Sequence, residues 1–150
     1  MKEVISLPAA QTMDLIKKYL IHAHPHPRKY KEAQYMTFRK VGGVMDTLYS
    51  IENELVLKPE EQNIYEQISF LNTDIKERLR GYINERKYTF GFGEKEDYKF
   101  YILKIEKNLN HLPIPKEGNM QSHTYYTYNE ITHGKREITR ESQLKKIKII

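Results

Sequence analysis

The chain has 150 residues and a mass of 18.0 kDa, which is the size of one ordinary domain. It contains no cysteine, which excludes disulfide scaffolds, thiolate zinc sites and cysteine nucleophiles. No apolar stretch approaches the roughly 20 residues that span a bilayer, and the N-terminus lacks the basic start and apolar run of a signal peptide. We therefore expect a single cytoplasmic domain over residues 1–150, with no membrane contact.

The charge is basic overall but unevenly distributed. There are 25 basic and 20 acidic residues, giving a net charge of +5, which permits a polyanionic partner. Residues 1–50 hold 8 basic and 4 acidic side chains, residues 51–100 hold 8 and 11, and residues 131–150 hold 6 and 2. The positive excess is thus confined to the two ends of the chain. A lysine-rich composition without any binding role would give the same count.

The first predicted element is a helix over residues 8–22. Ser6 is a suitable N-cap, and Met13, Ile16 and Leu20 recur at helical spacing. The helix ends at the segment His24-Pro-His-Pro, where alternate prolines favour an extended, polyproline-like connector. Residues 1–23 are therefore expected to form an N-terminal helical segment.

A pair of strands follows this connector. Residues 34–40, QYMTFRK, have the aromatic and β-branched content of a strand, and Gly42-Gly43 predicts a turn. Residues 44–57 predict one long strand or two strands with a bend near Asn53. The first part is expected to pair back on residues 34–40 as a hairpin.

The acidic middle of the chain predicts a helix over residues 60–80. Its apolar residues fall on one face, residues 72–74 are a possible break, and Gly81 is a candidate C-cap. Residues 98–105, YKFYILKI, predict a central strand that is buried on both faces.

The end of the chain predicts short elements. A strand is expected over residues 123–128, and a short helix over residues 130–133. Residues 143–150 form either a last strand or the point where a longer protein was cut, within a basic C-terminal segment of residues 135–150. The predicted fold class is α+β: a small mixed, partly closed β-barrel of five or six strands with an N-terminal helix and an inserted helix.

The order of these strand patterns resembles that of a known superfamily. The patterns are residues 34–39 (QYMTFR), 49–51 (YSI), 98–103 (YKFYIL) and 124–131 (TYYTYNEI), with the helical stretch inserted between the second and third. Together they resemble PUA-like domains, including the EVE branch, of the kind found in bacterial defence and restriction proteins. The resemblance covers about residues 28–131. It implies a nucleic-acid-binding module with a pocket for a modified or flipped base, in a bacterial or phage defence setting.

Basic and aromatic side chains supply the candidate nucleic-acid-binding residues. Cations neutralise phosphates, and tyrosine rings stack on unstacked bases. Half-buried sheet tyrosines with wet hydroxyls are the competing explanation. The expected binding residues are Arg28, Lys29, Tyr30, Tyr35, Arg39, Lys40, Tyr126 and Tyr128. The partner is DNA or RNA, with a partner protein or a fused effector domain as a further expectation.

Three alternate histidines, His22, His24 and His26, are weak candidates for metal ligands. Because prolines separate them within five residues, they do not easily converge on one ion. A second interpretation is that the imidazoles become cationic below their reference pKa of about 6.5 and add to a polyanion-binding surface. No metal and no other cofactor is predicted.

Two other classes of function remain open from the sequence. The first is a Mg²⁺-dependent nuclease of the restriction type, in which Glu85, Asp97 and Lys99 hold the ion and position water. The second is a non-catalytic protein-interaction module that uses the helix over residues 60–80. The sequence has no glycine-rich phosphate loop and no GxSxG setting, so a binding module is preferred over an enzyme.

Overall fold

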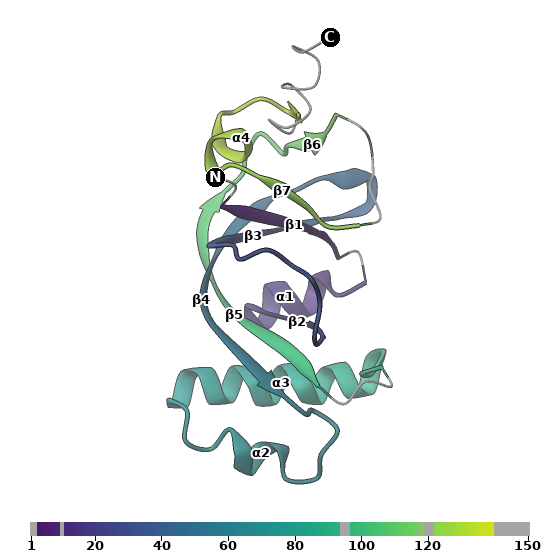
Figure 1. Cartoon of the computed structure of the whole chain (residues 1–150), viewed down its shortest axis with the longest axis vertical. Coiled ribbons are helices and arrows are strands. Elements are labelled where there is room, and N and C mark those ends of the chain that lie inside the picture. The colour runs from purple at the N-terminus through teal and green to yellow at the C-terminus, as the bar shows by residue number, and fades with distance from the viewer. Residues whose placement is uncertain (1–2, 10, 94–96, 117, 119–121, 140–150) are drawn as a thin grey trace. The chain divides into compact units, whose positions relative to one another are not determined.

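A computed structural model describes residues 3–9, 11–93, 97–116, 118 and 122–139 (Figure 1). The chain forms two compact units. The first contains Met1–Met13, Lys31–Ile51 and Ile105–Ile150, and the second contains Asp14–Tyr30 and Glu52–Lys104. None of the described helices is long and apolar enough to span a bilayer.

The fold is α+β, as predicted, with a six-stranded mixed sheet of order β2-β5-β4-β3-β1-β7 and a two-stranded sheet of β6 and β8. The long strands β4 and β5 each run from one unit into the other. The strands are β1 (Val4–Pro8), β2 (Ile21–Pro25), β3 (Tyr35–Arg39), β4 (Thr47–Leu57), β5 (Tyr98–Asn108), β6 (Ile114–Pro115), β7 (Thr124–Tyr126) and β8 (Glu137–Ile138). The helices are α1 (Met13–Tyr19), α2 (Ile64–Gln67), α3 (Thr73–Thr89) and α4 (Tyr128–Thr132), with a 3-10 turn, η1, at Val41–Gly43.

In the first unit, β1 pairs in parallel with β3 and antiparallel with β7, and β3 pairs antiparallel with β4. The predicted hairpin is therefore confirmed, and β4 is one continuous strand, so the predicted bend near Asn53 is wrong. Thr127 caps α4: its hydroxyl accepts from Glu130 N, and the Glu130 carboxylate accepts from Thr127 N. The core of this unit contains Val4, Met45, Leu48, Leu109, Tyr126, Ile131 and Ile138.

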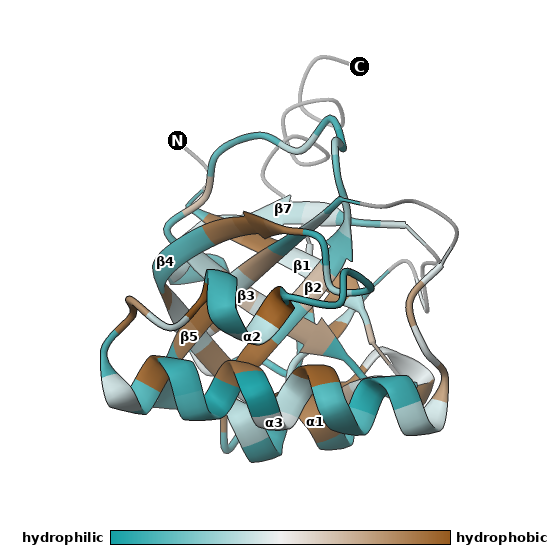
Figure 2. Cartoon of the chain, turned by 90° about the horizontal axis from the view of Figure 1, so that it is seen from below, coloured by the Kyte–Doolittle hydropathy of each residue, from teal (hydrophilic) through white to brown (hydrophobic). Residues whose placement is uncertain are grey.

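In the second unit, β2 pairs antiparallel with β5, and α3 covers one face of this pair. The core joins Ile21 and Ala23 of β2, Phe100 and Ile102 of β5, and Leu79, Tyr82 and Ile83 of α3. Figure 2 shows hydrophobic and hydrophilic residues interspersed along α3, as expected for a helix with one buried face. The prediction of a strand buried on both faces is confirmed for the first half of β5.

The predicted helix over residues 8–22 is wrong at both ends. Residues 4–7 are a short buried apolar run that forms β1, and Ser6 lies inside this strand and caps no helix. The helical spacing is real only within α1, because Leu20 adopts a left-handed φ of 54°. His24 and Pro25 belong to β2, which pairs with β5, so the first half of the predicted polyproline-like connector is a strand instead.

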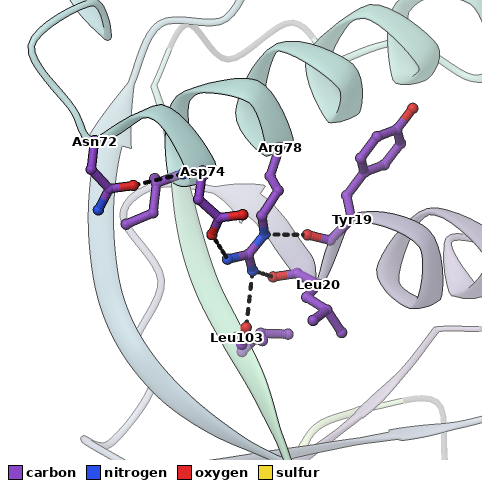
Figure 3. A network of polar contacts seen from close by, with 7 residues as sticks. Tyr19, Leu20, Asn72, Asp74, Arg78 and Leu103 are labelled. Carbon is purple, nitrogen blue, oxygen red and sulfur yellow. Dashed lines mark hydrogen bonds and ion pairs between the residues drawn. The ribbon is translucent and has the colours of Figure 1, made fainter.

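Arg78 of α3 hydrogen-bonds the main chain at Leu20, where the chain turns from α1 into β2 (Figure 3). Its Nε donates to the Tyr19 carbonyl at 2.8 Å, and its Nη2 donates to the carbonyls of Leu20 and Leu103 at 2.8 and 2.9 Å. Its Nη1 pairs with Asp74 at 3.2 Å. The last carbonyls of a helix lack intrahelical partners, so this guanidinium supplies the donors that end α1.

The helix predicted over residues 60–80 is two helices, separated at the break proposed for residues 72–74. Asn72 caps α3 by accepting from Ile75 N at 2.9 Å. Gly81 is not a C-cap. It lies inside α3, where the Tyr19 ring packs so closely that an added Cβ would clash with Tyr19 Cε1.

We therefore expect the substitution Gly81→Ala to destabilise the protein. In an ordinary helix interior the change would stabilise by about 1 kcal/mol, but the clash with Tyr19 should reverse the sign and cost about 1–2 kcal/mol. Urea unfolding of Gly81→Ala in the wild-type and Tyr19→Ala backgrounds measures this. If Gly81→Ala is stabilising in both backgrounds, the close packing does not limit the site.

Candidate nucleic-acid interface

The pairing of β2 with β5 gathers four polar side chains on one face of the second unit. His22 lies opposite Tyr101, and His24 lies opposite Lys99. Side chains alternate along a strand, so these four share a face while the residues between them enter the core under α3. His22 and His24 thus lie on one face of the sheet and not in a solvated loop.

His24 is held by hydrogen bonds on both ring nitrogens. Its Nδ1 lies 2.9 Å from the Pro25 carbonyl, and its Nε2 lies 2.9 Å from the Tyr101 hydroxyl. A carbonyl only accepts, so Nδ1 carries the proton and Nε2 accepts from the phenol. The two bonds fix the tautomer and the orientation of the ring.

Both histidines are buried, with 8% of His22 and 4% of His24 exposed. Burial is the main reason why the pKa of His24 falls to about 4 and the pKa of His22 falls well below its usual value. They are therefore neutral at pH 7, which corrects the interpretation of these two rings as cations on a polyanion-binding surface. No three His, Asp or Glu side chains group as metal ligands within the described residues.

Tyr30 lies beside this buried pair. Its ring meets the His24 ring edge-on, with the centroids 4.9 Å apart, and it is half-buried. Arg28 Nη1 donates to the Tyr30 hydroxyl at 3.0 Å, and the guanidinium lies 5.9 Å from the centre of the Tyr30 ring. Arg28 and Lys29 are exposed. The second unit thus combines two exposed cations, a half-exposed aromatic ring and a buried neutral hydrogen-bonding pair.

Five of the predicted binding residues lie in the first unit, where most have structural contacts. The Tyr126 side chain is fully buried in the core. The Tyr35 and Tyr128 rings pack on each other with centroids 5.1 Å apart, and the Tyr128 hydroxyl donates to Glu106 at 3.2 Å. Tyr128 belongs to α4, and so the expected strand position for this residue is wrong.

Arg39 and Lys40 are neighbours with different surroundings. Arg39 is 1% exposed, and its guanidinium donates to the carbonyl and hydroxyl of Ser6 and to the Ser122 carbonyl. Lys40 pairs with Asp46 at 2.7 Å at the surface. Because buried protein acceptors already hold the Arg39 guanidinium, our proposal does not include it as a phosphate contact.

The residues of the nuclease hypothesis stay apart. No hydrogen bond or ion pair joins any two of Glu85, Asp97 and Lys99, all of which lie in the described part of the chain. Each has a different partner: Tyr19 and Lys18 for Glu85, Lys58 for Asp97 and Glu54 for Lys99. The expected acid-x-lysine geometry therefore has no assembled set of ligands to support it.

Tyr101 is the residue of this site that the sequence did not indicate. It lies in the apolar-looking run of β5, and only its pairing with His22 across the strands brings its hydroxyl to His24. The alternate spacing of His22 and His24 was the available signal, because period-two polar residues are typical of one face of a strand.

Two solved structures are similar to this chain in fold. The ASCH protein from Zymomonas mobilis has 12% identity, with 99% of this chain and 95% of that chain covered and a TM-score of 0.49. A serine-to-alanine mutant of that ASCH protein has 8% identity, with 99% and 96% covered and a TM-score of 0.51. At this low identity the second likeness shows a shared fold and nothing more. No protein-family model and no curated protein matches the chain.

Proposed function

We propose that this protein is a nucleic-acid-binding module that holds an unstacked base. Arg28 and Lys29 neutralise phosphates, and Tyr30 stacks on the base beside the buried pair of His24 and Tyr101. The observation that carries the proposal is the position of Tyr30, half-exposed between the Arg28 cation and the buried His24 ring. The proposal includes no catalytic step.

The physical properties of these groups fit such a ligand. A cationic guanidinium and ammonium attract the phosphate backbone without regard to sequence. A tyrosine ring stacks on any base, and this is worth about 1–3 kcal/mol. The hydrogen bonds between His24, Tyr101 and the Pro25 carbonyl fix the His24 ring on which the edge of Tyr30 packs, so the stacking ring has a rigid support.

A flipped or modified base is the finer proposal. Taking a base out of a stack costs a few kcal/mol, and stacking on Tyr30 together with the phosphate contacts of Arg28 and Lys29 offsets this. The bacterial or phage defence setting that the PUA-like resemblance implies stays a prediction.

The test titrates DNA and RNA oligonucleotides, with plain and modified bases, at two salt concentrations, with and without Mg²⁺. Fluorescence anisotropy should show binding that weakens as salt increases, and gel analysis should show intact nucleic acid. Absence of binding to every oligonucleotide at low salt would overturn the proposal. Cleavage that requires Mg²⁺ would replace it with the nuclease hypothesis.

The double substitution of Arg28 and Lys29 by alanine should lower affinity and also its dependence on salt. Each single-strand phosphate contact contributes about 0.7 to the slope of log K against log salt, so the loss of two contacts should reduce this slope by about 1.4. Lys40→Ala is the matched control, because its side chain is ion-paired with Asp46. An unchanged slope in the double variant would remove both cations from the interface.

Tyr30→Ala should weaken binding of single strands by roughly 5- to 150-fold, the loss of one stacking contact. Tyr30→Phe should bind nearly as well as wild type, because it keeps the ring and loses only the hydrogen bond from Arg28. Equal affinities for Tyr30→Ala and wild type would show that this ring does not stack on a base.

A further inference from the structure

Arg86, in the last turns of α3, is a buried cation surrounded by aromatic rings. Only 8% of the residue is exposed. Its guanidinium carbon lies within 4.5–6.0 Å of four ring centroids, those of Phe92, Phe90, Tyr98 and Tyr82. Cation–π attraction to these rings replaces part of the hydration that burial removes.

The hydrogen bonds of Arg86 use two of its three nitrogens. Nε donates to the Gly91 carbonyl at 3.0 Å, and Nη1 donates to the Ala23 carbonyl at 3.1 Å and to the Tyr82 hydroxyl at 2.9 Å. These bonds satisfy three of the five N–H groups of a guanidinium. Among the described residues, none accepts from Nη2.

Among the described residues, no carboxylate compensates the charge of Arg86. Within the described residues Arg86 has no ion pair, whereas Arg78, two turns earlier on the same helix, pairs with Asp74. A buried arginine without a counter-charge is uncommon, because the desolvation of an ion costs several kcal/mol. The charge of Arg86 also acts on His22: after burial and His24, Arg86 is the next cause that lowers the pKa of His22.

The unused nitrogen is not recorded as enclosed by the described residues. Nη2 of Arg86 is absent from the described side-chain atoms that are both fully buried and without a hydrogen-bond partner. The two N–H groups of Nη2 have no acceptor among the described residues, whereas the aromatic rings and carbonyls hold the rest of the guanidinium in place. A fixed, partly desolvated guanidinium edge of this kind suits an oxyanion.

We propose that Nη2 of Arg86 binds a phosphate group, because none of the described residues around Arg86 supplies an anion. The phosphate belongs either to a free phosphorylated small molecule or to a nucleic acid. The inference stands apart from the interface of Arg28, Lys29 and Tyr30, because it rests on the uncompensated charge of Arg86 and its unused donors.

The direct test follows the side-chain ¹⁵N–¹H signals of Arg86 in the full-length wild-type protein by NMR. Inorganic phosphate, a nucleoside 5′-monophosphate and an oligonucleotide are titrated separately, against chloride at matched ionic strength. Saturable shifts with inorganic phosphate or the monophosphate, absent with chloride, support a free phosphate ligand. Shifts with the oligonucleotide alone support a nucleic-acid phosphate. Shifts with none of the three, or equal shifts with chloride, overturn the proposal.

Thermal unfolding gives an independent readout. At about ten times Kd, phosphate should raise Tm by roughly 3–5 °C in the wild type and in Arg78→Met, and by nothing beyond the chloride effect in Arg86→Met. The same rise in Arg86→Met would overturn the assignment. The Arg28→Ala, Lys29→Ala double variant should retain the phosphate response, so failure of the nucleic-acid proposal and failure of this one are distinguishable.

Discussion

Arg39→Ala should destabilise the protein by about 3–5 kcal/mol, the largest effect that we expect from a single substitution. The change removes donors from the Ser6 carbonyl, the Ser6 hydroxyl and the Ser122 carbonyl, and it leaves a cavity at a position that is 1% exposed. Urea unfolding at constant pH, followed by far-ultraviolet circular dichroism, measures the difference in free energy of unfolding.

Lys40→Ala is the matched control for this experiment. The side chain is adjacent in sequence, but it makes a surface ion pair with Asp46, and such pairs are worth about 1 kcal/mol or less. A loss of less than about 1 kcal/mol in Arg39→Ala would show that the buried guanidinium does not support the first unit. It would also reopen the prediction that Arg39 contacts phosphate.

The free energy of unfolding should decrease as pH falls from 7 to 5, because His22 and His24 are neutral in the fold. An unfolded histidine has a pKa of about 6.5, whereas burial lowers the pKa of His24 to about 4. Between these values the unfolded chain binds more protons, so protonation favours unfolding. Each buried histidine contributes a loss of up to about 1.4 kcal/mol per pH unit in this window.

The charges around His24 act in the same direction. Arg28 and Lys99 lower its pKa after burial, while the Pro25 carbonyl partly offsets this. The measurement compares urea unfolding at pH 7 and pH 5 for the wild type, His24→Gln and His26→Gln. His24→Gln should flatten the pH dependence, and His26→Gln, whose ring is only half-buried, should not. A slope in His24→Gln that equals the wild-type slope would contradict the assignment.

Much of the sheet could be predicted because its strands carry their own signals. The pattern QYMTFRK followed by two glycines specifies a hairpin locally, and YKFYILKI is apolar on both strand faces. The helix predicted over residues 8–22 was too long at its end because the spacing of Met13, Ile16 and Leu20 continues a helical period past the last residue of α1. The chain reversal there depends on Arg78, which is 58 residues away from Leu20 and invisible to any local pattern.

The candidate site could be predicted only in part for the same reason. Arg28, Lys29 and Tyr30 could be proposed from the sequence because basic and aromatic residues are adjacent there, and they stay a prediction. Arg39 looked equivalent to them, although its burial depends on β1 and on Ser122, which are distant in the chain. The pair of His24 and Tyr101 depends on a strand pairing over 77 residues, which composition does not reveal.

The side chains of α3 have a further consequence for β2, which stands at one end of the strand order. Leu103 N donates to the Leu20 carbonyl, and His26 N donates to the Asp97 carbonyl, so the main-chain groups of residues 20 and 26 face β5. These groups alternate in direction along an antiparallel strand, so the Ala23 carbonyl points away from β5. Arg86 Nη1 occupies this carbonyl. An unpaired edge strand is a template for a strand of another molecule. Because Arg86 occupies the Ala23 carbonyl, it hinders the pairing of another molecule's strand with β2. We expect a variant without this arginine to self-associate more readily at high concentration.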